Sequence, residues 1–297
     1  QLVKELEPGL NALFGLEYKR YENQHAEIYT NENSDRAFEE EVMLSGFANA
    51  QVKGEGAGVS FDQAQETFTA RYTHETVALA FAITEEAIED NLYDRLASRY
   101  TKALARSMSN AKQVKAVEPL IQGLPSTDNF DSGDGVSLFN TSHPTVAGTF
   151  KNTLSTQADL NETSLEQSMI DIAQMTDERG LRIAARGVKM IIPSELQFTA
   201  ERLMKSQGRT GTADNDINAI VSMGMIPQGY RINNYLTDTD AFYILTDIPN
   251  GMKMFTRAPL TTAMEGDFDT GNVRYKARER YSFGVSDPRG IFGVEGA

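Results

Sequence analysis

The sequence contains no cysteine and only three histidines, His25, His74 and His143. Without cysteine the chain can form neither a disulfide framework nor a thiolate nucleophile, and the compartment in which it folds stays open. No two histidines stand at the spacing of a metal-binding pair. The sequence therefore predicts no zinc or iron site. We expect His74, which alternates with apolar residues, to be packed rather than catalytic.

Long apolar runs and catalytic motifs are also missing. The longest apolar run, residues 77–83, is far too short to cross a membrane, and no signal-peptide pattern is visible. There is no Walker-type phosphate loop and no Gly-x-Ser-x-Gly turn. The glycines of residues 54–58 precede an extended segment rather than a helix, and the acidic residues 128–135 do not have calcium-loop spacing. We therefore expect no catalytic residues, no cofactor and no metal.

The overall composition is that of an acidic globular chain. Its 297 residues leave room for one large domain or two closely packed ones, with 40% hydrophobic and 24% charged residues. The 42 acidic residues outnumber the 28 basic ones, which gives a net charge of −14. Such a chain should be soluble and poorly attracted to free nucleic acid.

The segment between residues 42 and 83 predicts an unusually long two-stranded ribbon. Apolar and polar side chains alternate from Thr67 to Ile83, which indicates one strand of roughly seventeen residues. Residues 42–53 form its expected partner, and the glycine-rich residues 54–58 form the tip. A two-stranded ribbon is marginal by itself, and no third strand follows nearby. We therefore expect the ribbon to lie on another copy of the protein.

One long helix is predicted after this ribbon. Thr84 is suited to cap its start, Glu85 and Glu86 place negative charge in its first turn, and Pro119 is expected to end it. Apolar residues recur every three to four positions in between, so one face of the helix is expected to be buried. At about 1.5 Å per residue the helix would span roughly 45 Å.

The remaining segments give weaker signals. Residues 1–38 are expected to be either a loosely attached terminus or an arm that reaches a neighbour. Residues 160–255 alternate between helical and extended patterns, which favours a mixed α/β unit. Its main expected elements are a helix at 163–179, a strand at 188–192, a helix at 194–206 and a strand at 241–247.

The C-terminal stretch predicts a strand with one basic face. Between Asn272 and Val285 the apolar residues share one face, and the other face carries Arg274, Lys276, Arg278 and Arg280. Like charges two residues apart repel one another, so this face needs anions against it. Two interpretations stay open: a solvated face with partners in its own chain, or a docking strip for an acidic surface of a neighbour. Glu39, Glu40 and Glu41 are one such acidic surface.

Several motifs, in order and spacing, resemble the major capsid proteins of tailed bacteriophages with the Hong Kong 97-type fold. In the first half they are VKGEG at 52–56, YTHET at 72–76 and ITEEAIED at 83–90. In the second half they are LFNTSHP at 138–144, IIPSE at 191–195 and RYSFGVSDPRG at 280–290. The resemblance covers nearly the whole chain.

This resemblance implies an α+β fold with four parts. Residues 1–38 would be an N-terminal arm, and residues 39–76 an extended β-hairpin loop that overlies the adjacent subunit. Residues 77–154 and 254–297 would form a peripheral domain with a long spine helix, and residues 155–253 an axial domain. We expect contacts between subunits at the ribbon and at the basic strand, through Lys53, Glu55, Phe68, Tyr72, Arg274, Lys276, Arg278 and Arg280.

The function implied by the resemblance is structural. The chain would assemble with itself into hexamers and pentamers of an icosahedral shell that encloses double-stranded DNA without reading its sequence. It would be part of the virion after assembly in the host cytoplasm, with portal, scaffold and decoration proteins as further partners and no membrane contact. Two alternatives are an encapsulin-like compartment with protein cargo and, from another class, an acidic soluble hydrolase.

Overall fold

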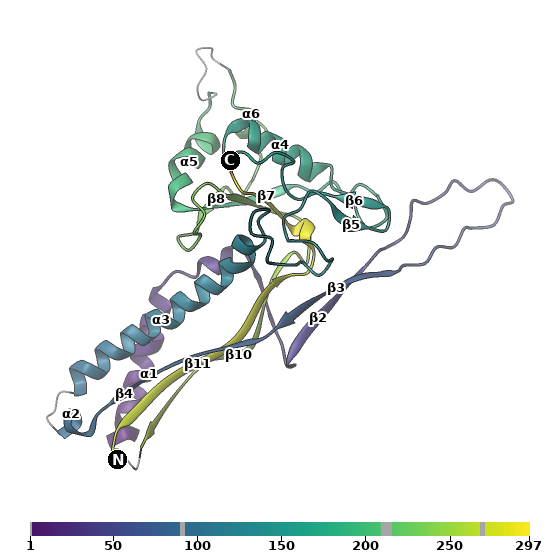
Figure 1. The fold of residues 1–297 in the computed structure, drawn as a ribbon. Coiled ribbons are helices and arrows are strands. Elements are labelled where there is room, and N and C mark those ends of the chain that lie inside the picture. The colour runs from purple at the N-terminus through teal and green to yellow at the C-terminus, as the bar shows by residue number, and fades with distance from the viewer. Residues whose placement is uncertain (1, 90–92, 209–215, 268–270) are drawn as a thin grey trace.

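The computed structural model describes residues 2–89, 93–208, 216–267 and 271–297. Figure 1 shows an elongated α+β molecule with a long arm of strands and helices, a rounded unit at one end of the arm, and a loop that projects from their junction. The N-terminus lies at the far end of the arm and the C-terminus in the rounded unit (Figure 1). Within the described residues, no helix is both long enough and apolar enough to cross a membrane.

A four-stranded sheet runs along the arm. Its strands are β1 (Thr30–Asn33), β10 (Met252–Gly266), β11 (Val273–Val285) and β4 (Glu75–Ile83), in that order across the sheet. β1 is parallel to β10, and the other pairs are antiparallel. The strand expected at residues 272–285 is therefore confirmed as β11.

Helices cover one face of this sheet. They are α1 (Leu2–Arg20), α2 (Glu85–Glu89) and α3 (Tyr93–Gln122), and the short helix η1 (Gln24–Glu27) follows α1. Buried side chains of α1, α3 and β11 form one apolar cluster, which includes Leu10, Phe14, Leu104, Met108 and Tyr275. This cluster explains the arrangement, because each helix buries its apolar stripe against the sheet.

Two expectations about the helices need correction. The long helix continues through Pro119 to Gln122, because a proline this close to the end removes only one hydrogen bond of the last turns. The expected continuity of this helix from Thr84 onwards falls on residues 90–92, which lie outside the described residues between α2 and α3. The N-terminal segment is not a loosely attached terminus, since α1 packs on α3 and buries Leu10 and Phe14.

The predicted ribbon is shorter than expected, and its long strand is two strands. β2 (Phe38–Leu44) pairs with β3 (Glu66–Thr73), but β4 leaves the ribbon after His74 and joins β11 in the large sheet. The side chain of His74 is buried at this change of partner, within 2.9 Å of the hydroxyl oxygens of Ser34 and Ser282. The expectation that His74 is packed is confirmed, and the expectation that the whole strand lacks cover in its own chain was wrong.

A second four-stranded sheet forms the centre of the rounded unit. Its order is β12 (Ile291–Val294), β9 (Phe242–Thr246), β7 (Gly187–Ile192) and β8 (Tyr230–Ile232). The strands expected at 188–192 and 241–247 are confirmed. β12 was expected with the first sheet, but it pairs with β9 because the chain returns through η3 (Pro288–Gly290) into the rounded unit.

Short helices and one hairpin surround the second sheet. The helices are α4 (Glu162–Ala173), η2 (Ser194–Leu196), α5 (Gln197–Lys205) and α6 (Ala219–Ser222). The hairpin consists of β5 (His143–Thr145) and β6 (Gly148–Phe150). α4 begins one residue earlier and ends six residues earlier than the expected 163–179, and Asn161 rather than Thr163 caps it, through a reciprocal pair of hydrogen bonds with Ser164.

Candidate assembly surfaces

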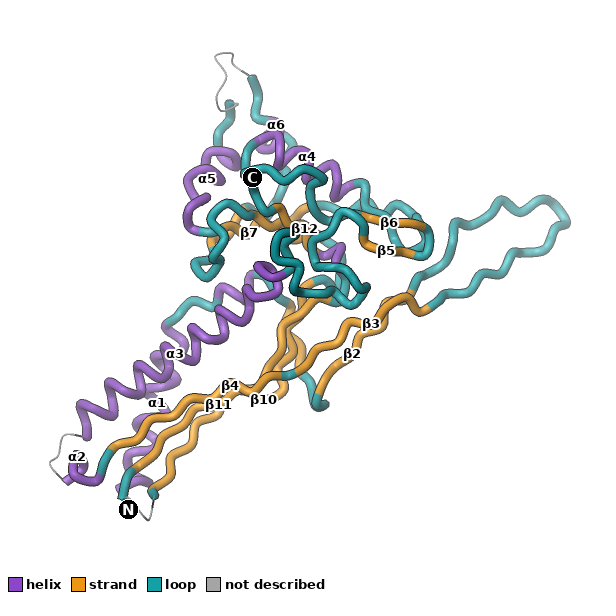
Figure 2. Tube along the Cα trace, viewed as in Figure 1, coloured by secondary structure: helices purple, strands orange, loops and turns teal. Residues whose placement is uncertain are grey.

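The extended loop, residues 45–65, is the most exposed described part of the molecule. It contains no helix or strand, and it projects away from both sheets (Figure 2). Val52 is 99% exposed and Phe61 is 97% exposed, and Phe47 and Val59 are also exposed. Lys53 and Glu55 lie at its exposed tip, where residues 55 and 56 form a turn. Apolar side chains held this far from their own core are typical of a surface that another molecule covers.

The root of the extended loop is fastened to the body. The Asp62 carboxylate accepts hydrogen bonds from the Ala48 backbone amide (2.7 Å) and from Nη2 of Arg179 (2.8 Å). The backbone amides of Ala48 and Gln63, and then the Arg179 charge, lower the pKa of Asp62. These contacts join the two limbs of the loop and tie them to the loop that follows α4. Only the part beyond this root is free of its own body.

Two residues that we expected to contact a neighbour lie at the base of the ribbon. Phe68 is half-buried, but Tyr72 is only 2% exposed and packs edge-on against Phe255, with ring centroids 4.8 Å apart. The Tyr72 hydroxyl is 2.5 Å from the Ser286 hydroxyl. The expectation for Tyr72 is therefore corrected, because its side chain is already enclosed by its own chain.

A buried polar cluster around His143 holds a loop against strand β3 of the ribbon. Both ring nitrogens of His143 face acceptor oxygens: Nδ1 lies 2.6 Å from Asp134 Oδ2, and Nε2 lies 2.9 Å from Asn152 Oδ1. The Asn152 amide nitrogen donates to two backbone carbonyls, which fixes Oδ1 as the acceptor. Gly133, beside Asp134, has a φ of +96° and approaches β3 so closely that an added Cβ would lie 2.9 Å from the Thr69 carbonyl oxygen. The cluster thus holds a tight loop directly against β3.

The basic face of β11 forms as the sequence predicted. Arg274, Lys276 and Arg278 are exposed and Arg280 is half-buried, whereas the opposite face packs under the helices. Arg274 pairs with Asp267, but within the described residues no ion pair is found for the other three. Opposite these four cations, β4 carries only small residues: Ala82, Ala80, Ala78 and Thr76. We call this row of four cations the cationic strip.

The acidic surface that we offered as a partner for the cationic strip is engaged within its own chain. Glu39 accepts a hydrogen bond from the Ser34 hydroxyl (2.7 Å), and Glu41 pairs with Lys253 (2.6 Å). Glu40 lies 3.8 Å from Arg71. Glu40 and Glu41 thus have cationic partners in their own chain, and Glu39 is held by a neutral hydroxyl group; the docking of these carboxylates on the cationic strip stays a prediction.

Sequence reasoning also missed a buried ion pair between α3 and β11. Glu279 is 2% exposed and its Oε2 accepts a hydrogen bond from Nζ of Lys112 at 3.1 Å. Burial raises the pKa of Glu279, and the Lys112 charge opposes this rise. The available signal was an acidic residue at a period-two position of the apolar face.

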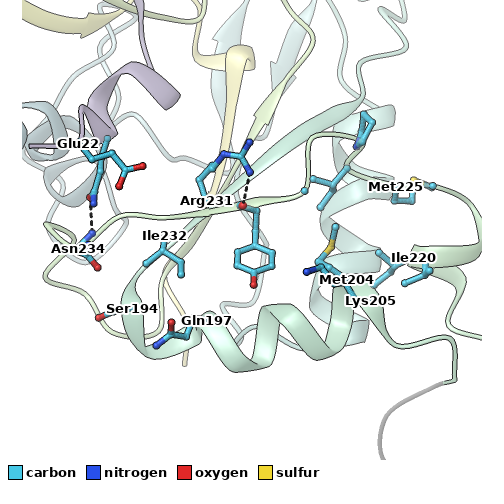
Figure 3. A pocket seen from close by; sticks show the side chains of 17 residues that line it. Glu22, Ser194, Gln197, Met204, Lys205, Ile220, Met225, Arg231, Ile232 and Asn234 are labelled. Carbon is cyan, nitrogen blue, oxygen red and sulfur yellow. Dashed lines mark hydrogen bonds between the residues drawn. The ribbon is translucent and has the colours of Figure 1, made fainter. Parts of the chain in front are cut away.

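A hollow of about 840 Å³ lies beside α5, α6 and β8, near the chain that follows α1 (Figure 3). Apolar side chains such as Ile220 and Met225 line one part, and polar groups line the other, where the backbone amide of Asn234 donates to the side-chain oxygen of Gln24 at 2.9 Å. Over the described residues, no group of His, Asp or Glu side chains is placed to hold a metal ion. Two hydroxyl groups of the lining donate to carboxylates, Ser194 to Glu195 (3.0 Å) and Tyr230 to Glu201 (2.6 Å), and the lining contains no histidine.

Many solved structures share this architecture. A virus-like particle protein from Pyrococcus furiosus matches with a TM-score of 0.56 and 11% identity, covering 96% of this chain and 98% of that one. The capsid of an empty GTA particle matches with a TM-score of 0.54 and 14% identity over 92% and 89% of the two chains. The capsid of Myoviridae phage XM1 gives a TM-score of 0.53 and 12% identity over 91% and 89%. The fold is thus that of shell-forming capsid proteins of the Hong Kong 97 type.

The sequence itself identifies the family. The model of the phage capsid protein family matches residues 66–294, which is most of the chain. No curated protein matches the sequence. The chain belongs to the phage capsid protein family, and the expectation of a major capsid protein that forms a bacteriophage shell is confirmed. Neither the encapsulin-like compartment nor the soluble hydrolase is favoured.

Proposed function

We propose that copies of this chain pack head to tail into hexamers and pentamers, and that these units close into an icosahedral shell around double-stranded DNA. The observation that carries this proposal is the extended loop, whose apolar side chains Val52 and Phe61 are almost completely exposed. A loop that covers a neighbour buries these side chains in every subunit of a ring. Each buried side chain of this size contributes about 1.5–3 kcal/mol before the costs of association.

The charge distribution supports a container rather than a DNA-binding surface. A net charge of −14 per subunit repels phosphates, so we propose that the DNA is enclosed without sequence-specific contacts. The cationic strip is the exception, and we propose that it faces an acidic surface of an adjacent subunit. Lys53, Glu55 and Phe68 are proposed contacts of the extended loop.

Other elements of the proposal follow from the family. We propose that residues 1–38 are the arm, that 39–76 are the loop, and that 77–154 with 254–297 form the peripheral domain, apart from β12. Residues 155–253 with β12 would then be the axial domain. Portal, scaffold and decoration proteins are further proposed partners, assembly takes place in the host cytoplasm, and the chain has no catalytic role.

Electron microscopy and analytical ultracentrifugation of the purified chain test assembly. We expect closed shells from the wild type and only small oligomers from the double variant Val52→Asp, Phe61→Asp. The matched control is Val146→Asp with Ile170→Asp, at residues that are 47% and 49% exposed, in the β5–β6 turn and on α4. Both double variants should keep the wild-type unfolding temperature to within a few degrees, because exposed positions contribute little to the fold. Shells formed equally well by the loop variant would contradict the proposal.

DNA enclosure has a separate test. Particles purified from infected cells should protect double-stranded DNA from added nuclease, and their subunits should show no sequence preference in a competition between DNA fragments. Particles that contain only protein would contradict this part of the proposal and leave shell formation intact.

A further inference from the structure

We propose that the outer edge of β4 receives an added strand, and that this strand is the return limb of the extended loop, residues 58–63, from a second copy of the chain. The inference rests on the proposed function, because it needs neighbouring subunits. It goes further by naming the surface that the loop covers and the kind of bonding that joins them.

The first observation is an unprotected sheet edge. β4 is the last strand of its sheet and pairs only with β11, and no described side chain or loop hydrogen-bonds to its other side. Its nine residues contain no charge and no proline after Glu75. Natural proteins usually guard a free edge with lysine, proline, a bulge or a covering segment, because its backbone amides and carbonyls would otherwise recruit another strand. An unguarded edge of this length is typical of strand addition.

The second observation is an apolar seam beside this edge. β4 lies along α3, because Glu75 contacts Lys115 (3.1 Å) near one end, and the rings of Phe81 and Tyr100 are 5.6 Å apart near the other. Between these contacts the helix covers the strand incompletely. Leu79 of β4 is 47% exposed, and Tyr100 and Val114 of α3 are 44% and 42% exposed.

The return limb has the two properties that this edge and seam require. Its backbone belongs to no strand or helix, so most of its amides and carbonyls are available for a ladder. Val59 and Phe61 are two residues apart, so in an extended limb they point to the same side. They are 68% and 97% exposed, and they can fill the seam beside Leu79. Ser60 points to the other side, where it would meet the small alanines of β4.

A second copy is the occupant because the limb cannot reach the β4 edge of its own chain. Figure 1 shows the loop projecting from the junction on one side, while β4 and α3 run away from that junction to the other end of the arm. Asp62, bonded to Arg179, fixes the root of the limb in this direction. A contact between two different surfaces repeats head to tail and closes into a ring when the rotation allows, which agrees with hexamers and pentamers.

Hydrogen–deuterium exchange on the wild-type protein tests the inference without any variant. We expect the β4 amides to exchange at least tenfold more slowly in assembled shells than in dissociated subunits, and residues 58–63 to become protected with them. β11, which is paired on both sides, is the internal reference and should change little. Shells in which β4 exchanges as fast as in free subunits would overturn the inference. Microscopy distinguishes that result from a chain that forms no shells, which would contradict the proposed function as well.

A disulfide experiment identifies the segment that occupies the β4 edge. Because the sequence contains no natural cysteine, only the introduced cysteines can form disulfides. The double variant Phe61→Cys, Leu79→Cys, oxidised after assembly, should give a ladder of covalent oligomers on a non-reducing gel. The control Phe61→Cys, Ile170→Cys has its second thiol at an exposed site on α4 and should give no ladder. Assembled shells with a protected β4 but no ladder would show that another segment occupies the edge, and would overturn the assignment to the return limb.

Discussion

At the scale of single residues, His25 makes the stability of the fold depend on pH in the acid range. Its side chain is buried between the turn after α1 and α3, with the Phe283 ring edge-on at a centroid distance of 5.9 Å. Burial, and then the nearby Lys112 charge, lower the pKa of His25 from 6.5 to about 4. The folded state therefore holds this ring neutral over a pH range in which the unfolded chain would protonate it.

The sign of the resulting pH dependence follows from this difference. Above pH 6.5 neither state binds the proton, so the contribution of His25 to stability is complete. As the pH falls from about 6.5 to about 4, His25 is protonated in the unfolded state but stays neutral in the folded state. The free energy of unfolding therefore decreases by about 1.4 kcal/mol per pH unit. Between pH 7 and pH 4.5 we expect the free energy of unfolding of His25→Gln to decrease by roughly 2–3 kcal/mol less than that of the wild type. Urea unfolding at each pH measures this difference.

The comparison with the variant is needed because carboxylates also titrate near pH 4 in both proteins. Their contribution cancels in the difference between the two curves, as long as both unfold in one cooperative step. Identical pH profiles for the wild type and His25→Gln would contradict the prediction.

At the scale of elements, the ion pair of Lys112 and Glu279 fastens the spine helix to the sheet. Lys112→Met leaves the Glu279 carboxylate buried without its partner, and we expect a loss of about 3–5 kcal/mol in the free energy of unfolding. Replacing both residues, by Lys112→Met with Glu279→Leu, should restore most of this loss, because no buried charge remains. Denaturant unfolding of the three proteins measures both effects.

Lys115 is the matched control on the same helix. Its ion pairs with Glu75 and Glu118 are exposed, so Lys115→Met should cost at most about 1 kcal/mol. A loss at Lys112 no larger than the loss at Lys115 would mean that the buried pair does not fasten the helix.

The elements that the sequence predicted well are those whose own periodicity decides their structure. β11 alternates between cations and apolar residues, and the helix from residue 93 onwards has an apolar stripe. The type and extent of each element therefore follow from its own sequence. The division between β3 and β4 could not be predicted, because both strands alternate in the same way and only the choice of pairing partner separates them. The alternation shows that a strand is present, but it does not show which strand lies beside it.

The candidate surfaces follow the same rule. Exposure of the loop tip and of the cationic strip could be predicted from glycines and from alternating charge. The enclosure of Tyr72 and the pairing of Glu41 with Lys253 depend on segments about two hundred residues away in the sequence. Such contacts are set by the tertiary fold, and a local pattern carries no information on them.

At the scale of the whole molecule, the chain places its projecting and its receiving surfaces at different ends. The extended loop points one way, while the β4 edge and the cationic strip lie along the arm that points the other way (Figure 1). A subunit of this shape cannot cover both surfaces by itself. A symmetric dimer cannot cover both either, if its interface uses the same surface of each subunit and leaves the other surface exposed. Both surfaces can be covered in a closed ring, where every subunit gives one contact and receives one. Each contact can then be weak, because the ring holds several at once.

The cationic strip gives this arrangement an electrostatic test. Reversing two of its charges, by Arg278→Glu with Arg280→Glu, places anions on a face that otherwise attracts them in a chain of net charge −14. Because Arg278 is exposed and Arg280 half-buried, and neither has a described ion-pair partner, we expect the monomer to stay folded while shell yield falls at least tenfold. The control Arg36→Glu with Lys102→Glu makes the same change in net charge at other exposed sites. Sedimentation of assembly reactions measures the yield.

Wild-type assembly should also weaken between 0.05 and 0.5 M salt, since screening shortens the reach of exposed charges to a few ångströms. Equal yields from the reversed strip and the control would show that the strip is only a solvated face, and that the rings close through the loop alone.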